Sequence, residues 1–167
     1  MTRVFALAAL VYLPMLIEAW VAARNERVQR ARGGVEPHGD VYRVMRVAYP
    51  AAFAAMIAES AWDGTHALVL AGLIVFVAGK ALKWWAIVTL GQAWTFRVIV
   101  RPGAPLIDRG PYRFMRHPNY VGVVGELIGV ALAAGARVSG PFVTIIFCAL
   151  MLKRIGVEER ALRRSEV

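Results

Sequence analysis

Residues 120–152 read YVGVVGELIGVALAAGARVSGPFVTIIFCALML and contain only two charged residues, Glu126 and Arg137. As one straight α-helix this stretch would be about 50 Å long at a rise of about 1.5 Å per residue. The hydrocarbon core of a bilayer is only about 30 Å thick. Because residues 135–140 (GARVSG) are rich in turn-forming types, the sequence predicts two membrane helices joined there as a hairpin.

Three further apolar stretches, at residues 4–23, 44–62 and 67–90, precede this hairpin. Each is close to the length that crosses a bilayer. The first follows a basic residue, Arg3, but no small-x-small cleavage site comes after it, so we interpret it as a retained helix rather than a signal peptide. With the hairpin, these stretches predict an all-α integral membrane protein of about five transmembrane helices.

The composition excludes an ordinary soluble domain and a disordered chain. Hydrophobic residues make up 59% and charged residues 19%, with a mean hydropathy of +0.54, whereas soluble domains are about 45–50% apolar and about 25% charged. The single Cys148 excludes an intrachain disulfide, and the three His residues are too dispersed for a metal motif, so no metal site is predicted.

Basic residues predict the topology of the chain. Lys and Arg concentrate at residues 24–46, 91–118 and 153–167, whereas residues 63–66 have none and residues 135–140 have one. By the positive-inside rule the three basic segments are cytoplasmic and the N-terminus is outside. Since the net charge of +9 follows this topology, we expect membrane lipids as partners and no nucleic acid. A bacterial inner membrane is the expected location.

We expect one membrane domain over residues 1–167, with a three-helix part at 1–90 and a catalytic region at 91–167. The segment 91–122, GQAWTFRVIVRPGAPLIDRGPYRFMRHPNYVG, is far longer than a connector of about 2–8 residues. Within it, His117-Pro118 predicts a helix that begins at Pro118 with His117 at its cap. The N-terminus of that helix favours an anion. The alternative interpretation is an interfacial amphipathic segment that contacts lipid phosphates.

Residues 109–122, RGPYRFMRHPNYVG, strongly resemble the signature of the isoprenylcysteine carboxyl methyltransferase family, integral membrane enzymes that use S-adenosylmethionine (SAM). The resemblance extends over roughly residues 75–163 and includes Leu90-Gly91, Trp94-Thr95 and the Glu158-Glu159 pair. It implies a cytoplasmic cofactor pocket over the last helical hairpin. The residues implied to bind the cofactor are Ala104, Pro105, Leu106, Ile107, Tyr112, His117, Pro118, Asn119, Tyr120 and Glu158. Arg154, four residues before Glu158 on one helical face, is implied to hold the methyl acceptor.

The resemblance leaves two acceptor classes. The chain lacks the Tyr-rich tail of the longer eukaryotic relatives, and VIVRPGAPLIDRGPYR at residues 98–113 is more similar to the short bacterial branch that O-methylates alkylpyrones. The resemblance therefore implies methylation of a carboxylate, enol or phenol oxygen on a lipophilic substrate that enters from the bilayer. Two alternatives stay open: an NADPH-dependent reductase of the sterol reductase type, which shares an Arg-His-Pro-x-Tyr pattern, and a non-enzymatic lipid-binding protein.

Ionisable residues inside membrane spans are usually paired or functional. Glu126 lies about 12 Å along the helix from Pro118. It is therefore a candidate catalytic residue that touches the acceptor, and the alternative is pairing with Lys80 or Lys83 to hold helices together. We interpret the other acidic residues of the spans, Glu18 and Glu59, as structural.

Overall fold

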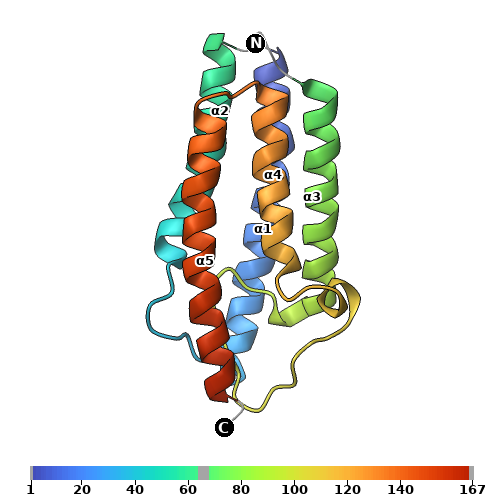
Figure 1. Ribbon diagram of the computed structural model, residues 1–167. Helices are drawn as coiled ribbons and strands as arrows, with labels where there is room; N and C mark the ends of the chain where they lie inside the picture. Colours follow the sequence, from blue (N-terminus) through green and yellow to red (C-terminus); the bar gives the residue numbers. More distant parts are fainter. Residues whose placement is uncertain (1, 64–67, 166–167) are drawn as a thin grey trace.

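The computed structural model describes residues 2–63 and 68–165. Its long helices run side by side along one axis (Figure 1) and are α1 (Thr2–Ala31), α2 (Tyr42–Asp63), α3 (Val69–Leu90), α4 (Pro118–Ala134) and α5 (Ser139–Ser165). Two short 3₁₀ turns, η2 (Gly91–Ala93) and η3 (Gly110–Arg113), lie between α3 and α4. The predicted all-α membrane architecture is confirmed.

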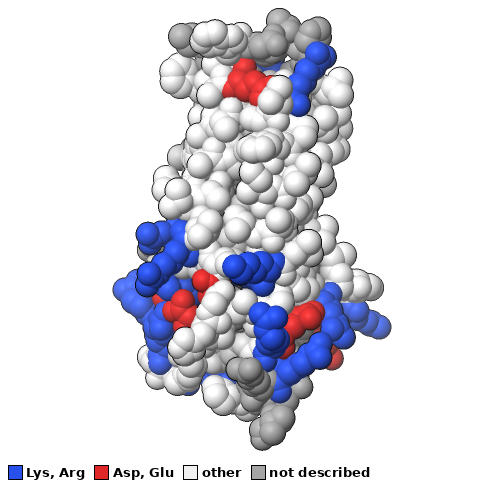
Figure 2. All heavy atoms as spheres, turned by 60° about the vertical axis from the view of Figure 1, so that its left-hand side comes forward, with Lys and Arg blue, Asp and Glu red and all other residues white. Residues whose placement is uncertain are grey.

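The long helices differ in length and in apolar character, the two properties that a membrane-spanning helix requires. By length and composition, α1, α3 and α5 are apolar enough to cross a membrane, and α4 is a shorter apolar helix. The remaining helix, α2, has 22 residues but carries Arg43 and Arg46 near its start. Figure 2 shows a broad uncharged band around the middle of the visible face, with most Lys and Arg at the end that is drawn lowest. This pattern is that of an integral membrane protein.

The predicted hairpin is confirmed at both of its ends. Helix α4 ends at Ala134, where Gly135 takes a left-handed φ of 71°, a conformation that glycine adopts without strain. Helix α5 then begins at Ser139 and continues without a break to Ser165. The Glu59 carboxylate accepts the backbone N–H groups of Val138 (3.0 Å) and Ser139 (2.7 Å), so it caps the start of α5. The predicted turn at residues 63–66 lies largely outside the described residues.

Helices α3 and α4 approach so closely that their backbones touch. A Cβ atom built on Gly72 of α3 would lie 2.3 Å from the backbone N of Ala133. One built on Gly129 of α4 would lie 2.4 Å from the backbone N of Phe76. The contact between these two helices therefore depends on glycine at both positions. The apolar core lies mainly among α1, α2, α4 and α5, around fully buried side chains such as Phe53, Met56 and Leu127.

Two long loops, residues 32–41 and 91–117, lie at the same end of the bundle as the end of α5 (Figure 1). An antiparallel bridge between Val35 and Val100 joins them. From α1, the Asn25 side chain donates to the carbonyl oxygens of Gly91 (3.0 Å) and Trp94 (2.8 Å). The N-terminal part of the chain thus supports the long loop that carries the family-like motif.

Candidate functional site

The start of α4 is the centre of the candidate site. The helix begins at Pro118 and has His117 as its N-cap, as predicted. Just before it, Gly110 has a φ of 60°, and a Cβ atom there would lie 2.4 Å from Oγ1 of Thr89. Only glycine fits this turn, which packs on the end of α3. The turn leads into the start of α4, where Tyr120 contacts α5.

A chain of hydrogen bonds links Arg154 to Glu158 through Tyr120. The Arg154 Nε donates to the Tyr120 hydroxyl (2.9 Å), and that hydroxyl donates to Oε2 of Glu158 (2.9 Å). Helix α5 is continuous through Arg154 and Glu158, so the prediction that they share one helical face is confirmed. Arg154 is only 6% exposed, so its guanidinium points into the protein rather than into solvent.

The other nitrogens of Arg154 contact two residues that the sequence analysis missed. Nη1 lies 3.3 Å from Oδ1 of Asp40, and Nη2 donates to the backbone oxygen of Phe96. The Asp40 carboxylate also accepts the backbone N–H groups of Tyr42 (3.0 Å) and Val98 (2.9 Å). An Asp whose side chain accepts the N–H two residues on is a recognisable turn-forming residue before a helix, but its contact with α5 has no local sequence signal.

Aromatic rings and a carboxylate gather around this chain. The Tyr112 phenol is partly buried, and burial followed by the negative charge of Glu158 raises its pKa above the ordinary value, which keeps it neutral. The His117 ring lies 5.5 Å from the Tyr120 ring, centroid to centroid, and its Nε2 is 3.4 Å from Oε1 of Glu159. His117 and Tyr120 therefore lie beside the Glu158-Glu159 pair, and Tyr112 is near enough to Glu158 to be affected by its charge.

The remaining implied cofactor residues are placed less centrally. Oδ1 of Asn119 accepts a hydrogen bond from Nε1 of the buried Trp94 (3.3 Å), so Asn119 ties the start of α4 to the long loop. The segment 104–107 lies in that loop, where Pro105 and Leu106 are exposed. The Ala104 N–H donates to the backbone oxygen of Arg101 (3.2 Å), which lies in the same loop. A role for residues 104–107 at the cofactor stays a prediction.

Glu126 belongs to a separate group of charges, which we call the intramembrane ion cluster: Glu18, Lys80, Lys83 and Glu126. Lys80 Nζ lies 3.0 Å from Glu18 and 2.8 Å from Glu126, and Lys83 Nζ lies 2.6 Å from Glu18 and 3.4 Å from Glu126. The Tyr49 hydroxyl donates to Oε2 of Glu126 (2.6 Å). Pairing with both lysines, one of the two alternatives for Glu126, is therefore observed. Its catalytic role stays a prediction.

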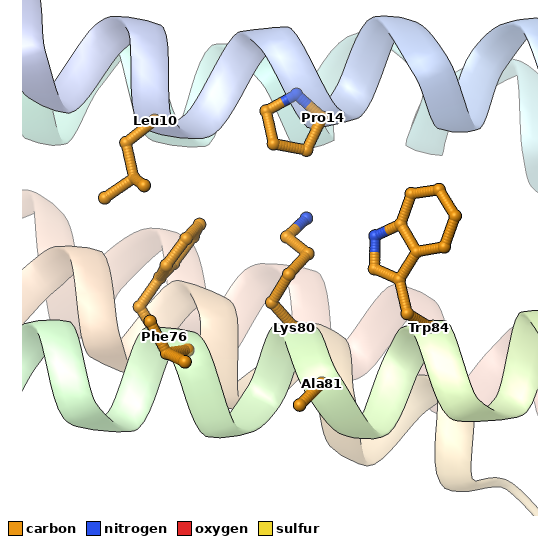
Figure 3. A pocket seen from close by; sticks show the side chains of 7 residues that line it. Leu10, Pro14, Phe76, Lys80, Ala81 and Trp84 are labelled. Carbon is orange, nitrogen blue, oxygen red and sulfur yellow. The ribbon is translucent and has the colours of Figure 1, made fainter.

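A groove of about 340 Å³ between α1 and α3 reaches the intramembrane ion cluster. Figure 3 shows the Lys80 amine pointing toward α1, between the rings of Phe76 and Trp84. On the α1 side the groove is lined by Leu10 and Pro14. Because Pro14 has no N–H, it cannot bond the carbonyl of Leu10, and α1 is locally weakened beside the groove. The groove is apolar apart from Lys80.

Comparison with known proteins identifies the family. The family model described as "Isoprenylcysteine carboxyl methyltransferase (ICMT) family" matches residues 71–164. The uncharacterized protein YpbQ of Bacillus subtilis is 30% identical over 96% of this chain and 97% of its own length. A probable protein-S-isoprenylcysteine O-methyltransferase of Oryza sativa subsp. indica is 32% identical over 56% of this chain and 50% of the plant protein.

Protein-S-isoprenylcysteine O-methyltransferase A of Arabidopsis thaliana is 29% identical over 53% of this chain and 46% of its own length. No solved structure matches the chain. The region matched by the family model contains α4, most of α5, Tyr120, Arg154 and Glu158. The chain belongs to the isoprenylcysteine carboxyl methyltransferase (ICMT) family.

Proposed function

We propose that the protein is a SAM-dependent methyltransferase that methylates an oxygen atom of a lipophilic acceptor at the membrane. Family membership supports a membrane methyltransferase, and the activity named for the plant relatives above favours methyl transfer over the reductase alternative. The observation that carries the proposal is the Arg154–Tyr120–Glu158 chain at the start of α4. It holds a cation and a carboxylate on the two sides of one hydroxyl, at one end of an apolar helix bundle.

The residues present fit SAM, which combines two cationic groups, a carboxylate and an adenine ring. The carboxylate of Glu158 suits a cationic amino group. The rings of Tyr112, His117 and Tyr120 suit adenine and a sulfonium ion. The positive end of the α4 helix dipole suits the ligand's carboxylate. Each of these groups comes from a described residue of the cluster.

When bound, SAM supplies an electrophilic methyl group, which an acceptor oxygen attacks in line with the breaking C–S bond. In this proposal Glu158 holds the cofactor, and the N–H groups of Arg154 that face away from its protein partners orient the acceptor. The neutral Tyr120 hydroxyl keeps the two side chains apart. Positioning and exclusion of water are the main contributions that we expect from the protein.

The acceptor in this proposal carries a carboxylate, enol or phenol oxygen on an isoprenylcysteine-like or alkylpyrone-like body. A carboxylate, or an enol or phenol acidic enough to be ionised in water, attacks as the anion and needs no strong general base. The apolar groove beside Lys80 is a route by which a lipid chain approaches from the bilayer. Glu126, two helical turns from Pro118, is our proposed additional catalytic residue because it could meet such an acceptor.

Binding of S-adenosylhomocysteine (SAH), the expected product, tests the cofactor. At a hundred times its dissociation constant, SAH should stabilise the purified protein by about 2.7 kcal/mol. Glu158→Gln should remove most of the resulting thermal shift, whereas Arg154→Ala should retain it while reducing methyl transfer. Arg27→Gln, whose exposed side chain donates to the backbone oxygen of Ala23 in its own helix (3.4 Å), is the matched control. A shift with NADPH and none with SAH would refute the proposal.

The orientation of the site follows from where the cofactor is made. SAM is a cytoplasmic metabolite, so we propose that the end with the long loops faces the cytoplasm of a bacterial inner membrane. In a Cys148→Ser background, a membrane-impermeant thiol reagent on whole cells should label Val138→Cys and spare Asp108→Cys, and both should react after lysis. Val138 is 77% exposed in the α4–α5 turn. Labelling of Asp108→Cys before lysis would invert this orientation.

A further inference from the structure

Asp40 lies outside the residues matched by the family model, yet its carboxylate reaches Arg154 of the candidate site. Its side chain is 2% exposed. Oδ1 accepts from the Tyr42 N–H and lies 3.3 Å from Nη1 of Arg154, while Oδ2 accepts from the Val98 N–H. One carboxylate therefore joins the start of α2, the loop between α3 and α4, and helix α5.

The contacts of Arg154 fix the plane of its guanidinium. Nε donates to Tyr120, Nη1 faces Asp40, and Nη2 donates to the backbone oxygen of Phe96. The guanidinium is flat and has five N–H groups, so one partner on each of its three nitrogens leaves it a single orientation. Of these partners, only Asp40 is charged. Among these three partners it is therefore the one that offsets the charge of the buried guanidinium.

Glu158 is the competing partner for Arg154. The two residues are four apart on α5, a spacing at which an arginine and a glutamate can pair directly. In the structure they do not contact each other directly but through the Tyr120 hydroxyl. A buried guanidinium that loses its carboxylate partner is strongly destabilised and turns to any other carboxylate within reach.

We propose that Asp40 is a positioning residue that holds the Arg154 guanidinium toward Tyr120 and Phe96 and away from Glu158. This leaves the Glu158 carboxylate available for the cofactor, so the inference rests on the proposed function. The loop of residues 32–41, which the sequence analysis treats as a topology signal, is then part of the site. Without Asp40, Arg154 pairs with Glu158 and competes with the cofactor for it.

The experiment measures the affinity of full-length protein in detergent for SAH by calorimetry. Asp40→Asn should weaken binding about tenfold, the effect of losing one charge-assisted hydrogen bond between Glu158 and the ligand. The double variant Asp40→Asn/Arg154→Gln should bind SAH within about threefold of wild type, because the competing cation is gone. A purely structural role for Asp40 would give no such rescue.

Glu36→Gln is the matched control, because Glu36 ties the same two loops together through Arg97 (2.7 Å) without touching Arg154. It should leave the SAH affinity unchanged. If Asp40→Asn does not fold, Asp40→Glu takes its place in the test. Asp40→Glu keeps the ion pair with Arg154, so it should bind SAH like wild type. The double variant should bind SAH as well.

Wild-type affinity in Asp40→Asn, equal losses in Asp40→Asn and Glu36→Gln, or no rescue by Arg154→Gln would each overturn the inference. If Asp40→Asn does not fold, a loss of SAH binding in Asp40→Glu would also overturn the inference. Failure of the wild-type protein itself to bind SAH would instead overturn the proposed function.

Discussion

Lys83→Met is expected to lower the free energy of unfolding by about 3–5 kcal/mol, the cost of leaving a buried charge without its partner. The Lys83 ammonium lies 2.6 Å from Glu18 and 3.4 Å from Glu126, and its side chain is only 3% exposed. Without Lys83, these two buried carboxylates share the single cation of Lys80. Unfolding followed by heat or denaturant in detergent micelles, at constant detergent concentration, measures the loss.

The charge-balanced double variant Lys83→Met/Glu18→Gln is the control for this prediction. It removes one cation and one anion and leaves the pair of Lys80 with Glu126 at 2.8 Å. Because the net charge of the intramembrane ion cluster is again zero, we expect the double variant to recover more than half of the lost stability. A double variant that is less stable than Lys83→Met alone would show that packing of the lysine stem, rather than charge balance, holds the helices.

Local signals in the sequence predicted the frame of the site. His117-Pro118 fixed the start of α4 because proline suits a first helical turn and disfavours helix in the residue before it. The turn-forming stretch 135–140 predicted the break after α4, and in the structure Gly135 ends the helix with a left-handed φ. The shared face of Arg154 and Glu158 followed from helical spacing alone.

Contacts between distant segments had no such signal. Asp40 and Arg154 are 114 positions apart, and no periodicity reports that a loop before α2 folds back on the end of α5. Whether Glu126 pairs with Lys80 and Lys83 stayed open for the same reason. The position of Glu126 along α4 does not determine which face of α3 is turned toward it. Helix α5 also continues past residue 152, where the apolar stretch ends, because hydropathy marks the depth of the membrane rather than the end of the helix.

Gly129→Val is expected to lower the free energy of unfolding by about 3 kcal/mol, the upper end of the usual cost of overpacking. A Cβ atom at Gly129 would lie 2.4 Å from the backbone N of Phe76 and 2.6 Å from its Cα. These are backbone atoms of α3, so no side chain can move aside to make room, and the helices must separate. Gly156→Ala on α5 is the matched control, because its Cβ meets only the flexible end of Arg160 at 3.5 Å.

Gly129→Val should also change the geometry of the candidate site, because Gly129 and Tyr120 lie on one rigid helix. If α4 moves away from α3, the Tyr120 hydroxyl shifts relative to Arg154 and Glu158, and both of its 2.9 Å hydrogen bonds are lengthened. Gly129→Val should therefore weaken SAH binding as well as stability, whereas Gly156→Ala should preserve SAH binding and add slightly to helix stability. Stability lost with SAH affinity unchanged would mean that the start of α4 is held by the long loop and α5 rather than by α3.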